Sequence, residues 1–197
     1  MNHFFTFEGI DGSGKSTIIK QVATVLKQKE YQVVTTFEPT DTWLGKYVQH
    51  QIKTKSDPFV TAFTFIADRI EHSKQIQEWI DQGNIVLCDR YAESTYAYQS
   101  VQLEKTLKNP INWLQDLSKS RILNPDRTFY FQITPEKALS RIQHRDELIF
   151  FEQQSFLRKV YNNYEHICKG DRFIQVDATK SIPELTELCL DKILSES

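Results

Sequence analysis

The segment from Gly9 to Ser16 constrains this chain more than any other. It reads Gly-Ile-Asp-Gly-Ser-Gly-Lys-Ser and fits the pattern G-x-x-x-x-G-K-[ST]. A short apolar run ending at Glu8 precedes it, and a segment with apolar residues at helical spacing follows it. A glycine-rich turn between a strand and a helix points backbone N–H groups at phosphate oxygens, and the helix dipole adds positive potential. The sequence therefore predicts a polyphosphate-binding loop.

Two side chains of this loop are expected to act on the phosphates directly. Lys15 should bridge the β- and γ-phosphates, and Ser16 should offer its hydroxyl to Mg²⁺. The predicted ATP-binding residues are Gly9, Ile10, Asp11, Gly12, Ser13, Gly14, Lys15, Ser16 and Thr17. The loop alone leaves three classes open, because kinases, hydrolytic switches and nucleotide-sensing modules all use it.

Short apolar runs alternate with segments of helical period along the chain, which predicts a doubly wound α/β fold with a five-stranded parallel sheet and helices on both faces. The expected strands are 3–8, 32–37, 84–89, 127–133 and 172–176. Most are continuously apolar, as is typical of strands covered on both faces. No repeat, low-complexity tract or Gly/Ser linker divides the chain, so we expect one domain over residues 1–197.

The longest expected helix covers about residues 57–82. Its apolar residues recur near a 3.6-residue period, at Phe59, Phe63, Ile66, Ile70 and Ile80. We interpret this stripe as part of the core or as a subunit interface.

Composition and charge exclude several classes. A net charge of -2 is unlike the strongly basic face of a general nucleic-acid binder. No apolar run approaches the ~18 to 20 residues of a membrane span, and the first expected strand leaves no room for a secretory signal. Cys88, Cys168 and Cys189 are odd in number and outside any ligand pattern. We expect a cytoplasmic protein that has no structural metal site and binds neither a membrane nor nucleic acid.

A carboxylate and a guanidinium end the third expected strand. Asp89 and Arg90 follow its apolar residues, and ligands in open α/β sheets bind beyond the carboxyl ends of the strands. We expect Asp89 to hold the waters of Mg²⁺ and Arg90 to clamp an anionic oxygen of the donor or the acceptor.

With these residues in place, the chain resembles the thymidylate kinase family over essentially its whole length. The resemblance rests on 7–17, Glu38-Pro39, 65–69 (Phe-Ile-Ala-Asp-Arg), 89–91 with Ser94 and 97–99 (Ala-Tyr-Gln), Pro125-Asp126 and 177–179. It implies the P-loop kinase fold with a short lid, and transfer of a phosphoryl group from ATP, with Mg²⁺, to dTMP. The product, dTDP, would feed dTTP synthesis. It also implies a homodimer packed through helices next to the sheet.

The resemblance implies an acceptor site as well. Phe65 would stack on thymine, and Arg69, one helical turn later, would donate to a carbonyl oxygen of the base. Asp11 would accept from the sugar 3′-hydroxyl, Thr95 and Gln99 would touch the base, and Tyr98 would crowd the 2′-position, each from an exposed loop. The full set is Asp11, Glu38, Pro39, Phe65, Arg69, Arg90, Ser94, Thr95, Tyr98 and Gln99.

A charged stretch at about 141–150 is expected to form the lid. Some members of the family carry a catalytic arginine in the phosphate loop and others carry it in the lid. Because the loop position is Gly12 here, a lid arginine must stabilise the charge on the transferring group. We select Arg145, with Arg141 as the alternative, beside Lys15 and Arg90 in the catalytic set.

Glu38 keeps a second function open. Phe37 and Thr40-Asp41 replace the Arg and Gly-Gly that flank Glu-Pro in bacterial members, so the group that holds the acceptor phosphate is undecided. The spacing from Glu38 to Trp43 is similar to that of deoxynucleoside kinases, in which a carboxylate accepts the proton of a neutral hydroxyl. Asp89-Arg90-Tyr91 differs from the Glu-Arg-Ser of those enzymes. A non-catalytic nucleotide-binding module is a third reading, which Lys15 and Asp89 disfavour.

Overall fold

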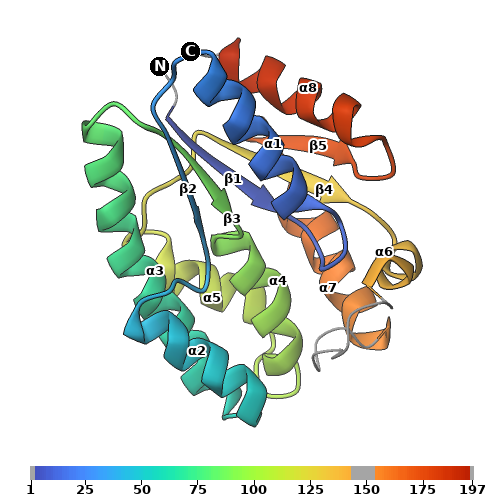
Figure 1. Cartoon of the computed structure of the whole chain (residues 1–197). Coiled ribbons are helices and arrows are strands. Elements are labelled where there is room, and N and C mark those ends of the chain that lie inside the picture. The colour runs from blue at the N-terminus through green and yellow to red at the C-terminus, as the bar shows by residue number, and fades with distance from the viewer. Residues whose placement is uncertain (1–2, 143–153, 196–197) are drawn as a thin grey trace.

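The computed structural model describes residues 3–142 and 154–195. Strands and helices alternate along much of the chain (Figure 1). The elements are β1 Phe4–Glu8, α1 Lys15–Gln28, β2 Val33–Phe37, α2 Trp43–Thr54, α3 Pro58–Asp81, β3 Ile85–Asp89, α4 Ala92–Leu103, α5 Pro110–Ser118, β4 Arg127–Gln132, α6 Pro135–Ile142, α7 Gln154–Ile167, β5 Phe173–Asp177 and α8 Ile182–Leu194.

The five strands pair in the order β2-β3-β1-β4-β5, and every pairing is parallel. The helices α1 and α8 lie together on one face, and α3, α4, α5 and α7 cover the other (Figure 1). In β1, Phe5 belongs to the core that includes α1, and Phe4 belongs to the core beneath α3 and α4. This alternation explains the continuously apolar strands, because each face of the sheet is buried. The predicted α/β fold is confirmed.

All five expected strands are present, with ends that differ from the expected ones by no more than a residue. The long helix α3 starts after Asp57, whose carboxylate accepts hydrogen bonds from Phe59 N at 2.8 Å and Val60 N at 3.2 Å. The residues of its expected apolar stripe differ in burial: Ile66 is 6% exposed, whereas Phe63 is 50% exposed. Part of the stripe is therefore core, and part is surface.

Because the strands are parallel, their carboxyl ends meet at one edge of the sheet. The loop after β1, the segment after β2 and the residues after β3 lie together at this edge (Figure 1). Within the described residues, none of the helices combines the length and the apolarity that a membrane span requires.

Candidate active site

The phosphate loop is closed around the ammonium of Lys15. Lys15 Nζ donates to the carbonyl oxygens of Gly9 at 3.0 Å and Ile10 at 3.1 Å, and to Ser13 Oγ at 3.2 Å. Burial, followed by the charge of Arg90, lowers the pKa of Lys15 to about 8, against the opposing effect of nearby carboxylates. The first turn of α1 holds no acidic side chain and no side-chain cap, so no capping side chain competes with an anion for its N–H groups.

The two residues expected to bind a metal are in direct contact. Ser16 lies in the first turn of α1 and Asp89 at the end of β3, and the Ser16 hydroxyl donates to Asp89 Oδ2. A hydroxyl and a carboxylate are the hard oxygen ligands that suit Mg²⁺. The tertiary structure thus brings the pair to the mouth of the phosphate loop.

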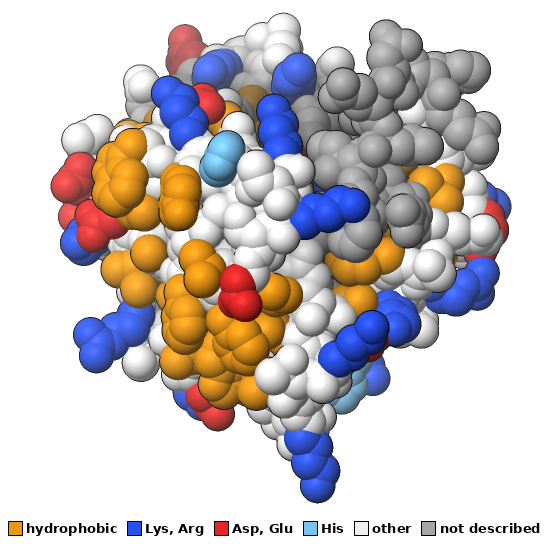
Figure 2. Space-filling view, turned by 90° about the horizontal axis from the view of Figure 1, so that it is seen from below, with side chains coloured by type: hydrophobic (Ala, Val, Ile, Leu, Met, Phe, Trp, Pro, Cys, Tyr) orange, Lys and Arg blue, Asp and Glu red, His pale blue; other side chains and the backbone are white. Residues whose placement is uncertain are grey.

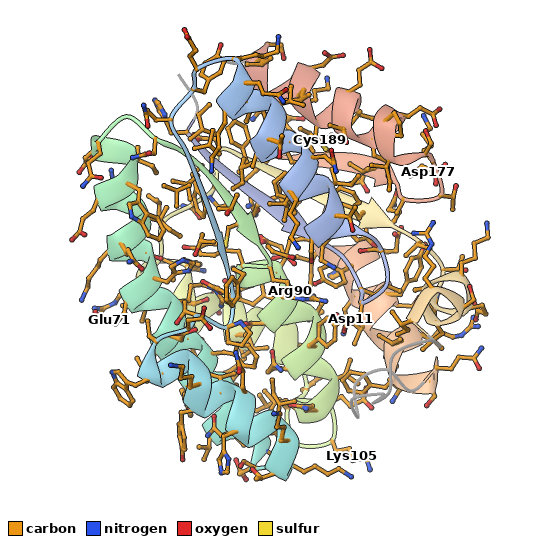
Figure 3. The ribbon with its side chains drawn as sticks, in the orientation of Figure 1. Asp11, Glu71, Arg90, Lys105, Asp177 and Cys189 are labelled. Atoms are coloured by element: carbon orange, nitrogen blue, oxygen red, sulfur yellow. The ribbon has the colours of Figure 1, made fainter. Side chains whose placement is uncertain are left out.

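Arg90 links the phosphate loop to α4. Its guanidinium donates to Asp11 Oδ1 at 2.5 Å, to Gly9 O at 3.1 Å and to Ser94 Oγ at 3.1 Å (Figure 3). Tyr98 donates to the other oxygen of Asp11 at 3.1 Å. Burial alone would raise the pKa of Asp11, but the charges of Arg90 and Lys15 outweigh it and lower that pKa. This network holds a cation at the centre of the site.

Two cavities meet at Arg90. The first, of about 560 Å³, is lined by the phosphate loop, Asp89, Arg141 and the α8 side of the site. The second, of about 150 Å³, lies between α2, α3 and α4. The first cavity is bounded in part by Lys180, Ile182 and Leu185, which the sequence did not single out. Asp11, Glu38 and Arg90 line both cavities, so the two cavities are adjacent at these residues.

The smaller cavity, which we call the base cavity, contains nearly the whole expected acceptor site. Its lining is Asp11, Glu38, Pro39, Ile52, Phe65, Arg69, Arg90, Tyr91, Ser94, Tyr98 and Gln99. Ile52 was missed, because no motif marks it and only the packing of α2 against α3 brings it to the cavity. Thr95 does not line the cavity, although it was expected to touch the base. Its hydroxyl instead accepts from Arg69 Nη2 at 2.8 Å.

The expectation of exposed loops was wrong for Thr95, Tyr98 and Gln99. All three lie on α4 and are buried, with 0%, 8% and 2% of their surface exposed. The reason is the position of α4, which packs against α3, α5 and α7 and so has little free surface. Tyr164 of α7 also reaches this region, where its hydroxyl contacts Ser94 Oγ at 2.8 Å.

Glu38 has no free oxygen for a proton-transfer role. Its Oε2 accepts from Arg69 Nε at 2.7 Å, and its Oε1 lies 3.0 Å from His72 Nδ1. A general base must reach the proton that it abstracts. The two contacts disfavour Glu38 as the base of a deoxynucleoside kinase.

Arg141 lies over the phosphate loop at the end of α6. Its guanidinium donates to Gly12 O at 3.4 Å and to Ala178 O at 2.9 Å. Gly12 has a φ of +82°, and a Cβ added there would lie 2.4 Å from the carbonyl oxygen of Ala138. The loop therefore has no room for a side chain at this position. Arg145 and residues 143–150 of the expected lid lie outside the described residues.

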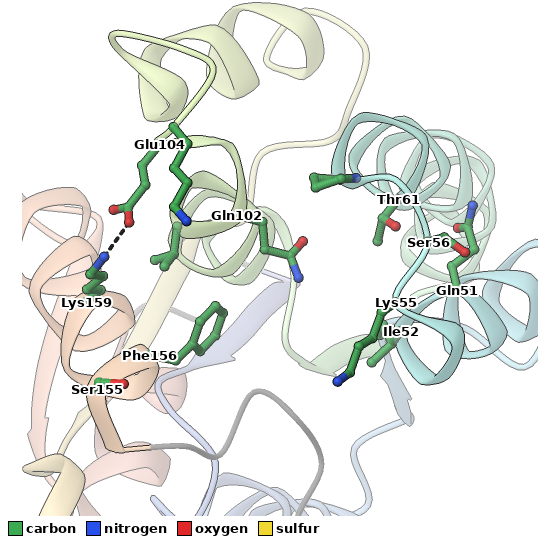
Figure 4. Close-up of a pocket in the computed structure, with 13 residues that line it drawn as sticks. Gln51, Ile52, Lys55, Ser56, Thr61, Gln102, Glu104, Ser155, Phe156 and Lys159 are labelled. Atoms are coloured by element: carbon green, nitrogen blue, oxygen red, sulfur yellow. Dashed lines mark hydrogen bonds and ion pairs between the residues drawn. The ribbon is translucent and has the colours of Figure 1, made fainter.

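A third cavity, of about 560 Å³, lies between the α2–α3 side and the α4–α7 side of the molecule (Figure 4). Amide and lysine side chains line it, including Gln102, Lys55 and Lys159, which pairs with Glu104. It meets the base cavity at Ile52 and shares no lining residue with the phosphate cavity. The phosphate and base cavities are therefore the candidate active site.

A parallel sheet with a glycine-rich loop after β1, a lysine inside that loop and an aspartate at the end of β3 matches the P-loop kinase fold. The family model described as thymidylate kinase matches residues 7–188. The chain belongs to the thymidylate kinase family.

Similar proteins span nearly the same length. A probable thymidylate kinase of Methanosarcina barkeri is 39% identical over 193 residues, covering 96% of this chain and 94% of the relative. A probable thymidylate kinase of Sulfurisphaera tokodaii is 38% identical over 197 residues, covering 99% and 97%. One of Natronomonas pharaonis is 34% identical, covering 95% of each chain.

Proposed function

We propose that the protein transfers the γ-phosphoryl group of ATP to dTMP, giving ADP and dTDP for dTTP synthesis. The observation that carries the proposal is the position of Arg90, which lines both the phosphate cavity and the small cavity that Phe65 and Arg69 also line. A nucleoside monophosphate bound with its base in the small cavity would direct its phosphate toward Arg90.

On the donor side, the loop amides and Lys15 would hold the β- and γ-phosphates of ATP. Ser16 and Asp89 would hold Mg²⁺, which would neutralise charge on the phosphate oxygens. Among the described residues, no group of three His, Cys, Asp or Glu side chains could bind a metal alone.

On the acceptor side, Phe65 would stack on thymine, and Arg69 would donate to a carbonyl oxygen of the base. Arg69 Nη1 is buried and has no hydrogen-bond partner among the described residues, whereas its other nitrogens are engaged. Gln99 would touch the base from α4, and Tyr98 would crowd the 2′-position. Asp11 would accept from the 3′-hydroxyl.

The reaction needs no general base. A phosphate monoester has a second pKa near ~6, so the attacking oxygen is already anionic at neutral pH. That oxygen attacks the γ-phosphorus in line, and the bond to the β–γ bridging oxygen breaks. Lys15, Arg90 and a lid arginine, Arg145 or Arg141, would stabilise the charge on the transferring group. Arg90 is also the cation that would hold the acceptor phosphate, for which the sequence offered no certain candidate.

We further propose a cytoplasmic homodimer that packs through α3. Phe63 and Val60 are 50% and 46% exposed, and Phe63 contacts Trp113 of α5 edge to face. Figure 2 shows apolar side chains gathered on the left of the underside, the side of α2 and α3. We expect sedimentation to give twice the monomer mass, and Phe63→Lys to reduce it to that of the monomer. The three buried, unpaired cysteines suit a reducing compartment.

An acceptor panel tests the proposed reaction. Purified protein with ATP-Mg is given dTMP, dUMP, dCMP or thymidine, and ADP formation is followed. We expect turnover with dTMP and little with thymidine. Turnover with thymidine alone would establish a deoxynucleoside kinase instead. ATP binding without ADP formation on any acceptor would establish a non-catalytic module.

A further inference from the structure

Behind the base cavity lies a buried chain of polar contacts that the proposed reaction does not use. Thr36 Oγ1 lies 2.7 Å from His72 Nε2, and His72 Nδ1 lies 3.0 Å from Glu38 Oε1. Glu38 Oε2 lies 2.7 Å from Arg69 Nε. His72, Glu38 and Arg69 are 3%, 5% and 1% exposed. Water therefore competes little for these contacts, and each partner fixes the next.

The chemistry of the groups sets the direction of each hydrogen bond. Glu38 accepts from Arg69, and a carboxylate has no hydrogen to give, so His72 Nδ1 must donate to Glu38. In the neutral imidazole, Nε2 then accepts from the hydroxyl of Thr36. Both oxygens of Glu38 are engaged, and the carboxylate has no freedom to rotate away from Arg69.

Arg69 is held from two sides, which leaves one nitrogen unused. Nε donates to Glu38, and Nη2 donates to Tyr91 O at 2.9 Å and to Thr95 Oγ1 at 2.8 Å. Nη1 is the remaining nitrogen of a guanidinium that lines the base cavity. A planar guanidinium fixed at Nε and Nη2 can present Nη1 in only one direction.

A second contact from α3 secures the segment that carries Glu38. Asp68, one helical turn before His72, accepts from Thr40 N at 2.9 Å, from Thr40 Oγ1 at 2.6 Å and from Thr42 Oγ1 at 3.1 Å. Three side chains of one helix, Asp68, Arg69 and His72, thus bind the chain that follows β2. The position of Glu38 is set by α3 and not by its own strand alone.

We infer that His72 is a positioning residue for base recognition: it holds Glu38 in place, and Glu38 aims Arg69 Nη1 into the base cavity. This inference rests on the proposed function and deepens it. Thymine presents a carbonyl acceptor at the 4-position, where cytosine presents an amino donor. A fixed Nη1 donor can hydrogen-bond to the carbonyl oxygen of thymine but not to the amino group of cytosine. His72 therefore acts on the selectivity between the two bases without touching either one.

The test compares kcat/KM for dTMP and dCMP in the full chain. The variants are His72→Leu, which removes both contacts, and His72→Asn, whose amide nitrogen can replace Nδ1 as the donor to Glu38. Thr36→Val removes only the outer hydroxyl. Glu71→Gln is the control, because Glu71 adjoins His72 on α3 but points into solvent and pairs with Lys74 (Figure 3).

For His72→Leu we expect KM for dTMP to rise about tenfold, the loss that one buried, charge-assisted hydrogen bond represents. The preference for dTMP over dCMP should fall by a similar factor, and KM for ATP should stay unchanged. His72→Asn should recover most of the preference, and Thr36→Val should lose part of it. Glu71→Gln should match the wild type.

Several outcomes would overturn the inference. Wild-type protein that does not phosphorylate dTMP would refute the proposed function and the inference with it. Normal wild-type turnover, with unchanged base preference in folded His72→Leu, would refute the inference alone. If His72→Leu does not fold, Thr36→Val decides, since an unaltered base preference in that variant would also refute the inference.

Discussion

Arg90 Nη2 lies 2.5 Å from Asp11 Oδ1, so an ion pair joins the residue after β3 to the phosphate loop after β1. The pair stands where the phosphate cavity meets the base cavity. Arg90 also has a φ of +68°, a left-handed conformation that is uncommon for a residue other than glycine. Backbone strain of this kind is concentrated at functional sites, so we interpret the position of Arg90 as one that serves function and not folding.

Replacement of Arg90 by Lys tests that placement. The substitution keeps the positive charge. One ammonium group, however, cannot contact Asp11, Gly9 O and Ser94 Oγ at the same time, as the planar guanidinium of Arg90 does. We expect kcat/KM for dTMP to fall roughly 100-fold in steady-state assays. Arg121→Lys, at an exposed position between α5 and β4, is the control and should be neutral. Equal activity of the two variants would remove Arg90 from the catalytic set.

Gly12→Ala should damage the contact between the phosphate loop and α6. The new Cβ would lie 2.4 Å from Ala138 O, in a backbone conformation with φ of +82°. Gly83→Ala is the matched control, because Gly83 has φ of +84° and no described atom near the added Cβ. Left-handed strain costs about 1 kcal/mol at both positions. We expect a clearly larger fall in Tm for Gly12→Ala, together with lost turnover; equal shifts in Tm would contradict the packing argument.

Binding of ATP should weaken as the pH rises through about 8. Burial and the charge of Arg90 lower the pKa of Lys15 to about 8, so above this pH the free protein loses an ammonium that would face the phosphates. Titration with ATP-Mg between about pH 7 and 9.5 measures the effect. Lys15→Ala, for which we expect kcat to fall roughly 100-fold, should show no such pH dependence. Near-normal turnover of that variant would show that Lys15 has another role.

Glu8 should make stability depend on pH. Its carboxylate is fully buried and accepts from Tyr91 N at 2.7 Å, Ser94 Oγ at 2.6 Å and Tyr164 OH at 3.0 Å. Burial, followed by the charge of Glu93, raises the pKa of Glu8 to about 7 from 4.5, although Arg90 and hydrogen bonds oppose the rise. The folded state therefore binds the proton more tightly than the unfolded state. The stabilisation is complete below the unfolded pKa and is lost as the pH rises through about 7.

Glu8→Gln is the variant that isolates this effect. Its amide oxygen can accept from the backbone, and its nitrogen can donate to the two hydroxyls. The amide does not titrate, so its charge stays the same at every pH. Between about pH 5 and 8, we expect the free energy of unfolding of the wild type to fall relative to the variant by up to roughly 3 kcal/mol. Urea denaturation at both pH values measures the difference. Parallel pH profiles would show that Glu8 does not titrate in this range.

Features that depend on neighbours in the chain were predictable. The phosphate loop, its flanking strand and helix, and the five strands follow from local pattern, because a strand with both faces covered and a helix with one apolar face have different periods. Phe65 and Arg69 were correctly placed on one side of α3, since residues four apart share a helix face.

Features that depend on contacts between distant segments were not predictable. Ile52 reaches the base cavity because α2 packs on α3, and Thr95 faces Arg69 because α4 packs against α3. Phe63 is exposed at the surface, although it belongs to the same helical period as the buried Ile66. Periodicity states which side chains share a face, but burial depends on what covers that face.

Local chemistry in the chain therefore specified a phosphate loop, a parallel α/β fold and the kind of residues that the site uses. Only the packing of α2, α3 and α4 decided which nitrogen of Arg69 is free and that Glu38 is fully engaged. The physical reason is that a hydrogen bond requires its two atoms to lie within about 3 Å, and residues 31 or more positions apart reach that distance only in the folded chain.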